Sequence, residues 1–159
     1  MELIASYFVE GTPAPQGSKT PIRRGNKIIL IEGSGSGTQR HKDWRSAVSE
    51  YTATFMKASK VEEIDHIIRV ELNFKIRKPK SRPRRMNAVD VRPDIDKLSR
   101  AVLDGMTSLQ GKHLLLKDDS LVVELYADKY YCEPDEPSGV FISVYDISDK
   151  RLRGEPRPL

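Results

Sequence analysis

The chain has 159 residues, of which 31% are charged, and its formal net charge is +4 at neutral pH. At this length we expect one domain with a hydrophobic core, and the basic excess is compatible with nucleic-acid binding. The single cysteine excludes an internal disulfide and a cysteine-rich zinc site. No apolar run is long enough for a membrane span, and the N-terminus is unlike a signal peptide, so we expect a cytoplasmic protein.

The first third of the chain predicts two short strands and a helix. Residues 2–9 read as a strand, which a Gly- and Pro-rich loop at 11–18 ends. Residues 27–32 are a short apolar strand, one arm of a hairpin, and GSGSG at 33–37 has the composition of a flexible linker. A helix capped by Thr38 or Asp43 then runs to about Ser59, with its apolar stripe at Trp44, Ala47, Val48, Tyr51 and Phe55.

Residues 66–76 alternate between apolar and polar side chains, which predicts a half-buried strand covered on one face by helices. Residues 75–85 follow with seven basic residues, no acid and two prolines, a composition typical of a solvated loop. Such a loop serves either to keep the surface soluble or to contact phosphates. Because it leads directly to a group of acids, we favour phosphate contact, with Lys78, Lys80, Arg82, Arg84 and Arg85 as candidates.

The acids are Asp94 and Asp96 at the start of a predicted helix over 94–108, and Asp118 and Asp119 ahead of a strand. The helix has an apolar stripe at Ile95, Leu98, Val102 and Met106, with Asp96, Arg100 and Asp104 on the polar flank and Gly111 as a stop signal. Carboxylates that converge from a helix start and a strand start favour a magnesium or manganese site. The alternative is structural: Asp94 caps the helix, Asp96 pairs with Arg100, and the second acidic pair forms a turn.

The last third predicts a strand over 120–131, with Leu121, Val123, Leu125 and Ala127 inward, and a final strand over 139–147. The fold class that follows is α/β (α+β), a small mixed or antiparallel sheet of about four strands with two main helices on one face. We expect a single domain over residues 1–148 and a polar C-terminal tail over 149–159. No glycine-rich nucleotide-binding motif is present, which argues against a kinase or dehydrogenase and against a nucleotide cofactor.

The string PDIDKLSRAVLDGM at 93–106, followed by DDSLVVEL at 118–125 and Lys129, resembles the RusA family of Holliday-junction resolvases, which are often phage-encoded. FVEGTPAPQGSK at 8–19 is similar to the way such proteins begin. The resemblance implies a small dimeric endonuclease of a bacterial host cell, active in DNA recombination and repair. It also implies that Asp94, Asp96 and Asp119 bind Mg²⁺, or Mn²⁺ as a substitute, and that Lys129 is a cationic helper.

The chain departs from the family motif at three positions. Arg100 stands where the family has a lysine, Lys97 where it has an asparagine, and Leu121 where it has a glutamine. An arginine clamps a phosphate oxygen but does not pass a proton, so Arg100 retains the electrostatic part of the role, and Lys97 is the alternative ammonium.

The sequence therefore predicts a magnesium-dependent endonuclease that resolves four-way DNA junctions by paired symmetric nicks, with catalytic residues Asp94, Asp96, Asp119, Arg100 and Lys129. Two alternatives remain: a branched-DNA-binding protein of the same fold that does not cleave, and a structural protein whose acids are caps. The two-fold symmetry of a junction favours a homodimer. Tyr126, Tyr130, Phe141 and Tyr145 fall outside the inward-facing sets and are available for its interface.

Overall fold

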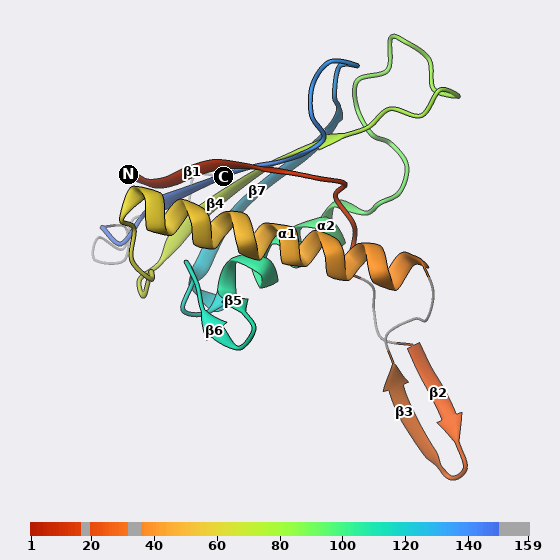
Figure 1. The fold of residues 1–159 in the computed structure, drawn as a ribbon, viewed down its shortest axis with the longest axis horizontal. Coiled ribbons are helices and arrows are strands. Elements are labelled where there is room, and N and C mark those ends of the chain that lie inside the picture. Colours follow the sequence, from red (N-terminus) through yellow and green to blue (C-terminus); the bar gives the residue numbers. More distant parts are fainter. Residues whose placement is uncertain (17–19, 32–35, 150–159) are drawn as a thin grey trace.

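The computed structural model describes residues 1–16, 20–31 and 36–149, and these form a four-stranded sheet with two helices packed on one face (Figure 1). The strands lie in the order β1-β8-β4-β7; β4 and β7 are parallel and the other pairs are antiparallel. Their bounds are β1 Glu2–Glu10, β4 Ile68–Ile76, β7 Val122–Tyr131 and β8 Gly139–Asp146, and the helices are α1 Ser36–Ser59 and α2 Ile95–Thr107. The predicted mixed sheet with two helices on one face is confirmed.

The core lies between the sheet and the helices. Alternation along β4 places Ile68, Val70, Leu72 and Phe74 fully inside, as predicted, and β8 contributes Val140, Ile142 and Val144 from the neighbouring register positions. The predicted stripe of α2 completes the core with Leu98, Val102 and Met106, all fully buried. Within the described residues, no helix is long and apolar enough to cross a membrane.

On α1 the predicted inward face is correct at Trp44 and Val48 and wrong at Tyr51, which is 41% exposed. Thr52 takes the inward position instead, because its hydroxyl is satisfied by the Tyr7 hydroxyl at 2.8 Å and by the Val48 carbonyl oxygen at 2.7 Å. The polar residue Thr52 is therefore buried, although the apolar pattern alone predicts that its neighbour Tyr51 is buried.

The inward set predicted for β7 is partly wrong. Val123 and Leu125 are 54% and 45% exposed, and Leu121 belongs to the short 3-10 turn η1 (Asp119–Leu121) that precedes the strand. The register between β4 and β7 shifts after the Ile68–Val122 pair, which leaves Val123 as an extra residue and interrupts the alternation. Because β7 is also an edge strand, the helices leave part of its inner face open.

Two small hairpins complete the described chain. The strand predicted at 27–32 is β3 (Lys27–Ile31), and it pairs with β2 (Thr20–Arg24). The sequence did not predict β2, because Pro21 is typical of a loop. This hairpin projects away from the sheet (Figure 1). Gly111 does not stop α2 as predicted. It has a φ of +78° in the turn between β5 (Ser108–Leu109) and β6 (Lys112–His113), while α2 ends at Thr107. Part of the predicted linker and all but the first residue of the predicted tail lie outside the described residues.

The two helices meet at Gly105. A Cβ atom there would lie 2.7 Å from Val48 Cγ1 and 3.2 Å from the Arg45 carbonyl oxygen. Ser49 Oγ donates to the Gly105 carbonyl oxygen at 2.9 Å and to the Ser108 carbonyl oxygen at 3.1 Å, so the crossing is held by hydrogen bonds as well as by packing. This contact fixes the position of α2, the helix that carries Asp96.

We expect Gly105→Ala to lower the free energy of unfolding by about 1–2 kcal/mol, because the cost of overpacking exceeds the gain in helix propensity. Urea denaturation measures the change. Val48→Ala in the same chain removes the contact with Cγ1 but leaves the contact with Cβ at 2.8 Å, so the double variant should recover only part of the overpacking cost and be somewhat more stable than the sum of the two single losses predicts. A single Gly105→Ala variant that is more stable than the unaltered chain would contradict this packing.

Candidate active site

Asp94 occupies the N-cap position of α2, but its side chain does not cap the helix. Its carbonyl oxygen accepts the first helical bond from Leu98 N at 3.0 Å, whereas its carboxylate accepts no capping hydrogen bond. The carboxylate is half exposed and lies 3.4 Å from Lys97 Nζ. The capping explanation of Asp94 therefore fails, and its carboxylate is held only by one surface ion pair.

Asp96 and Asp119 line one hollow of about 520 Å³ together with Arg100, and we call it the Asp96 hollow. Its other lining residues are Ile95, Ser99, Leu103, Leu125 and Ala127. Asp96 and Arg100 come from successive turns of α2, and Asp119 comes from η1. Among the described residues neither carboxylate has a hydrogen-bond or ion-pair partner, and no ion pair joins Asp96 to Arg100. The structure thus brings three of the five predicted catalytic residues together with their charged groups available.

Asp118 forms a turn, which is the structural role that the sequence left open for the second acidic pair. Its carboxylate accepts a hydrogen bond of 2.8 Å from Ser120 N and caps η1, and hydrogen bonding from Ser120, by its side chain and then by its backbone N–H, lowers the pKa of Asp118. Because Asp118 is committed to the turn, Asp119 is the member of the pair left to serve a ligand.

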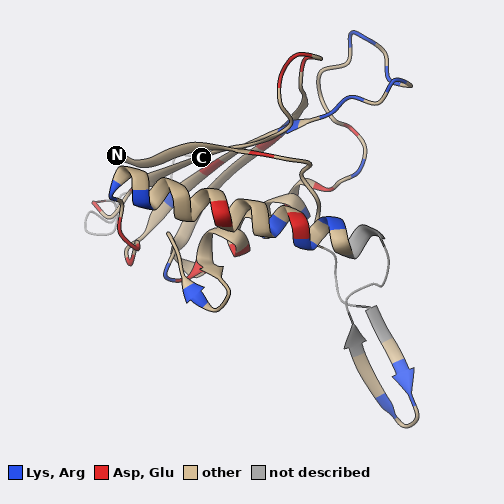
Figure 2. Ribbon diagram, in the orientation of Figure 1, with Lys and Arg blue, Asp and Glu red and all other residues tan. Residues whose placement is uncertain are grey.

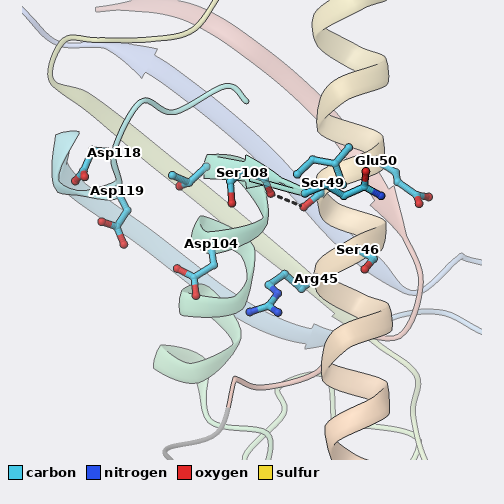
Figure 3. A pocket seen from close by; sticks show the side chains of 11 residues that line it. Arg45, Ser46, Ser49, Glu50, Asp104, Ser108, Asp118 and Asp119 are labelled. Carbon is cyan, nitrogen blue, oxygen red and sulfur yellow. Dashed lines mark hydrogen bonds between the residues drawn. The ribbon is translucent and has the colours of Figure 1, made fainter. Parts of the chain in front are cut away.

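Asp119 also lines a second hollow, of about 530 Å³, between α1 and the end of α2, which we call the Asp104 hollow (Figure 3). Arg45 of α1 and Asp104 of α2 enter it from opposite helices, and Ser46, Ser49 and Glu50 line its α1 wall. Sequence reasoning placed Asp104 on the polar flank of its helix but missed Arg45. Arg45 follows Trp44 on the predicted helix, and only the crossing at Gly105 brings it to the hollow that Asp119 also lines.

Lys129 lies on β7 and holds the segment that leads into α2. Its ammonium donates hydrogen bonds to the carbonyl oxygens of Val91 and Pro93, both at 2.8 Å. Residues 87–89 lie along the outer edge of the same strand, where Val89 N donates a hydrogen bond to the Lys129 carbonyl oxygen at 3.3 Å. In this arrangement Lys129 fixes the approach to Asp94 rather than entering the Asp96 hollow.

The basic loop predicted at 75–85 lies at one end of the sheet, where Figure 2 shows Lys and Arg along it. Its cations divide into two groups. Lys78 donates to the Arg84 and Met86 carbonyl oxygens at 3.0 and 2.8 Å, and Arg82 pairs with Asp90 at 3.4 Å. The exposed side chains of Lys80, Arg84 and Arg85 have no partner within the described chain and are available to a ligand.

The donor set fits a hard divalent cation. Magnesium in proteins is commonly held by one or two carboxylates, with waters and substrate phosphate as its other ligands, and Asp96 and Asp119 supply two carboxylates in one hollow. In residues 1–16, 20–31 and 36–149 no group of three or more His, Cys, Asp or Glu side chains lies close enough to hold a metal ion. A contribution from Asp94 requires its carboxylate to leave Lys97.

Comparison with known proteins agrees with this arrangement. No curated protein matches the chain in a sequence search. The model of the family described as endodeoxyribonuclease RusA matches residues 11–145, a range that contains every predicted site residue. The match covers most of the chain and extends well beyond the acidic motif, through β4, both helices and β7. The chain therefore belongs to the RusA family of endodeoxyribonucleases, enzymes that resolve Holliday junctions.

Proposed function

We propose that the chain is a magnesium-dependent endonuclease that cuts four-way DNA junctions by paired symmetric nicks. The observation that carries the proposal is the Asp96 hollow, where two unpartnered carboxylates and one guanidinium meet in a chain of the RusA family. Carboxylates for a cation and a fixed positive charge for phosphate are the groups that hydrolysis of a phosphodiester requires. The same family membership favours the cytoplasm of a bacterial cell, phage-infected or not, as the place where it acts.

Asp96 and Asp119 would hold Mg²⁺, or Mn²⁺ in its place, and Asp94 would join them once Lys97 turns to a phosphate. The bound cation would supply an acidified water and neutralise charge on the phosphate. Arg100, one turn along α2 and lining the same hollow, would hold a non-bridging phosphate oxygen with two of its N–H groups. Lys129 keeps residues 91–93 in place, and so acts on the reaction through the position of Asp94.

We further propose that the chain acts as a homodimer. The register of the sheet places Leu3, Tyr126, Tyr130 and Phe141 on the face without helices, and each is between 45% and 55% exposed. Tyr145 lies on the same face and is partly buried. A two-fold dimer presents two sites with the symmetry of a junction, and exposed apolar side chains gathered on one face are typical of such an interface.

The experiment that tests the function uses a synthetic four-way junction labelled on each strand in turn. With Mg²⁺ we expect nicks at symmetric positions on two opposing strands, and none after chelation. A linear duplex of the same sequence serves as the control and should remain intact. Cleavage of the duplex at the same rate would contradict a junction-specific enzyme.

A second candidate function is binding of branched DNA without cleavage, because Arg100 replaces the lysine of the family motif and Leu121 the glutamine. Tight junction binding with no nick in either Mg²⁺ or Mn²⁺ would favour it. Failure to bind junction DNA even at low salt would exclude both candidates.

Arg100→Lys tests the departure from the family motif. If the reaction uses a proton donor at this position, the variant should cleave faster than the unaltered chain, mostly near the pH at which an ammonium titrates, because a lysine ammonium can donate a proton there and arginine cannot. Arg100→Ala is the control and should be about a hundredfold slower, the cost of losing one fixed donor to the transition state. Equal rates for the arginine and lysine forms at every pH would mean that this position supplies charge alone.

A further inference from the structure

A third hollow, of about 630 Å³, lies where the basic loop meets the turn between β7 and β8; we call it the Tyr131 pocket. Figure 1 shows these two loops beside each other at one end of the sheet. The lining of the pocket contains one acid, Glu133, and five cations: Arg77, Lys78, Lys80, Arg82 and Arg84. Outside the lining, Asp90 pairs with Arg82, and the turn between β7 and β8 carries Asp135 and Glu136, so the positive charge of the pocket lies on its basic-loop side.

Two of the cations build the walls of the pocket. Arg77 donates to the carbonyl oxygens of Glu133, Pro134 and Glu136 at 3.3, 3.4 and 2.8 Å. Lys78 donates to two carbonyl oxygens of the basic loop and lies 5.6 Å from the centre of the Tyr131 ring. Because carbonyl groups satisfy their hydrogen bonds without cancelling their charge, both residues shape the loops and keep the pocket electropositive.

Tyr131 lines the pocket and is only 9% exposed, yet its hydroxyl is buried without a hydrogen-bond partner. Buried hydroxyls almost always have a partner, because an unsatisfied one forfeits the hydrogen bonds that it makes in water. Its backbone is well fixed, with Tyr131 N donating to the Asn87 carbonyl oxygen at 2.7 Å. The pocket thus combines a positive wall with a hydroxyl that lacks an acceptor among the described residues. Because this hydroxyl is closed to solvent, an anionic oxygen reaches it only when the side chains that cover it move aside.

We infer that the Tyr131 pocket binds one phosphate group of the DNA strand, with Lys80, Arg84 and the Tyr131 hydroxyl as its ligands. The inference rests on the proposed DNA substrate and adds a specific contact to it. Lys80 and Arg84 are exposed and have no partner in the described chain, so both are available. A phosphodiester has the charge and the acceptor oxygens that these three donors can satisfy together.

The strand β7 connects this pocket with the active site. Ala127, Lys129 and Tyr131 pair with Leu72, Phe74 and Ile76 and therefore point to the same face of the sheet. Ala127 lines the Asp96 hollow, and Tyr131 lies four residues further on, about 13 Å away at the rise of a strand. This spacing places the bound phosphate within a few nucleotides of the phosphate that is cut.

A scan of neutral phosphates tests the inference without requiring cleavage. Junctions that carry a single methylphosphonate, moved outward one position at a time from the branch point, are titrated without divalent metal. The unaltered chain should lose about ten- to a hundredfold in affinity at one or two adjacent positions, the size of one charge-assisted hydrogen bond. The double variant Lys80→Ala/Arg84→Ala should no longer sense those positions, and Tyr131→Phe should sense them more weakly than the unaltered chain.

The salt dependence separates the hydroxyl from the cations. Tyr131→Phe should weaken binding of the unmodified junction with an unchanged salt slope, whereas the double variant should flatten the slope by about 0.9 for each phosphate that it no longer neutralises. Tyr51→Phe, an exposed tyrosine on α1, is the matched control and should behave as the unaltered chain. Equal thermal unfolding of both tyrosine variants shows that folding is unaffected.

The failure of this inference differs from the failure of the proposed function. A chain that nicks junctions with Mg²⁺ but shows the same methylphosphonate profile with Tyr131→Phe keeps the nuclease and overturns the pocket. A chain that shows the predicted profile and never nicks keeps the pocket and overturns the nuclease. A chain that does not bind the junction overturns both.

Discussion

Asp96→Asn and Asp119→Asn will each reduce junction cleavage at least about a thousandfold, because a metal ligand contributes several kcal/mol to the transition state and each ~1.36 kcal/mol is a factor of ten. Binding of the junction should stay equal or become tighter, since each change also removes a negative charge that faces phosphate. Single-turnover cleavage and a binding titration, measured on the same labelled junction, separate the two effects.

Asp118→Asn is the matched control, because Asp118 is next to Asp119 and similarly exposed but caps η1. Asparagine caps nearly as well as aspartate, so this variant should fold normally and cleave within a few-fold of the unaltered chain. Normal cleavage by Asp119→Asn together with an inactive Asp118→Asn would show that the ligand of the pair is the residue we assign to the turn.

Asp94→Asn distinguishes a ligand from a partner of Lys97. A direct ligand gives a loss as large as that of Asp96→Asn. If Asp94 serves only to hold Lys97 at 3.4 Å, the double variant Asp94→Asn/Lys97→Ala should be no worse than the single Lys97→Ala variant. We expect the large loss, because the carboxylate of Asp94 has no capping bond that would explain its place at the helix start.

The sequence predicted the elements whose pattern is local and repeated. Alternation along β4 and the stripe of α2 are set by periods of about two and 3.6 residues, and the side chains concerned are buried as predicted. The prediction of the inward face of β7 failed because one extra residue at Val123 interrupts the alternation. No local signal in the sequence marks this bulge, since its cause lies in the pairing with β4. The prediction that Tyr51 is buried failed because the distant Tyr7 hydroxyl offers Thr52 a hydrogen-bond partner inside the core.

For the site, spacing grouped Asp94 and Asp96 with Asp118 and Asp119, and the resemblance to the RusA family singled out Asp96, Arg100 and Asp119, which the fold brings into one hollow. The relations that sequence did not reveal are long-range. Lys129 reaches carbonyl oxygens 36 and 38 residues earlier in the chain, and Arg45 reaches the Asp104 hollow only because the helices cross at Gly105. The partner of a polar side chain across such separations depends on the packing of the whole domain.

The assembly of the chain is open to an equally direct experiment. We expect a particle mass near twice 18.0 kDa in solution, with Leu3, Tyr126, Tyr130 and Phe141 buried between the two copies. Phe141 is 47% exposed and packs on Phe8 at a ring separation of 5.1 Å, so it projects from the middle of the face without helices. A carboxylate at this position would be buried without a partner in the dimer and solvated in the monomer.

Phe141→Asp should therefore raise the dissociation constant of the dimer more than about a hundredfold, the equivalent of about 3 kcal/mol. Sedimentation measures the mass, and the order of nicking measures the consequence: paired nicks within one binding event should become single nicks. Tyr51→Asp on α1, 41% exposed on the helical side, is the control and should remain dimeric. The two nicks require one active site on each of two opposing strands of the junction. A chain that is monomeric at micromolar concentration, both free and on the junction, would therefore contradict the dimer.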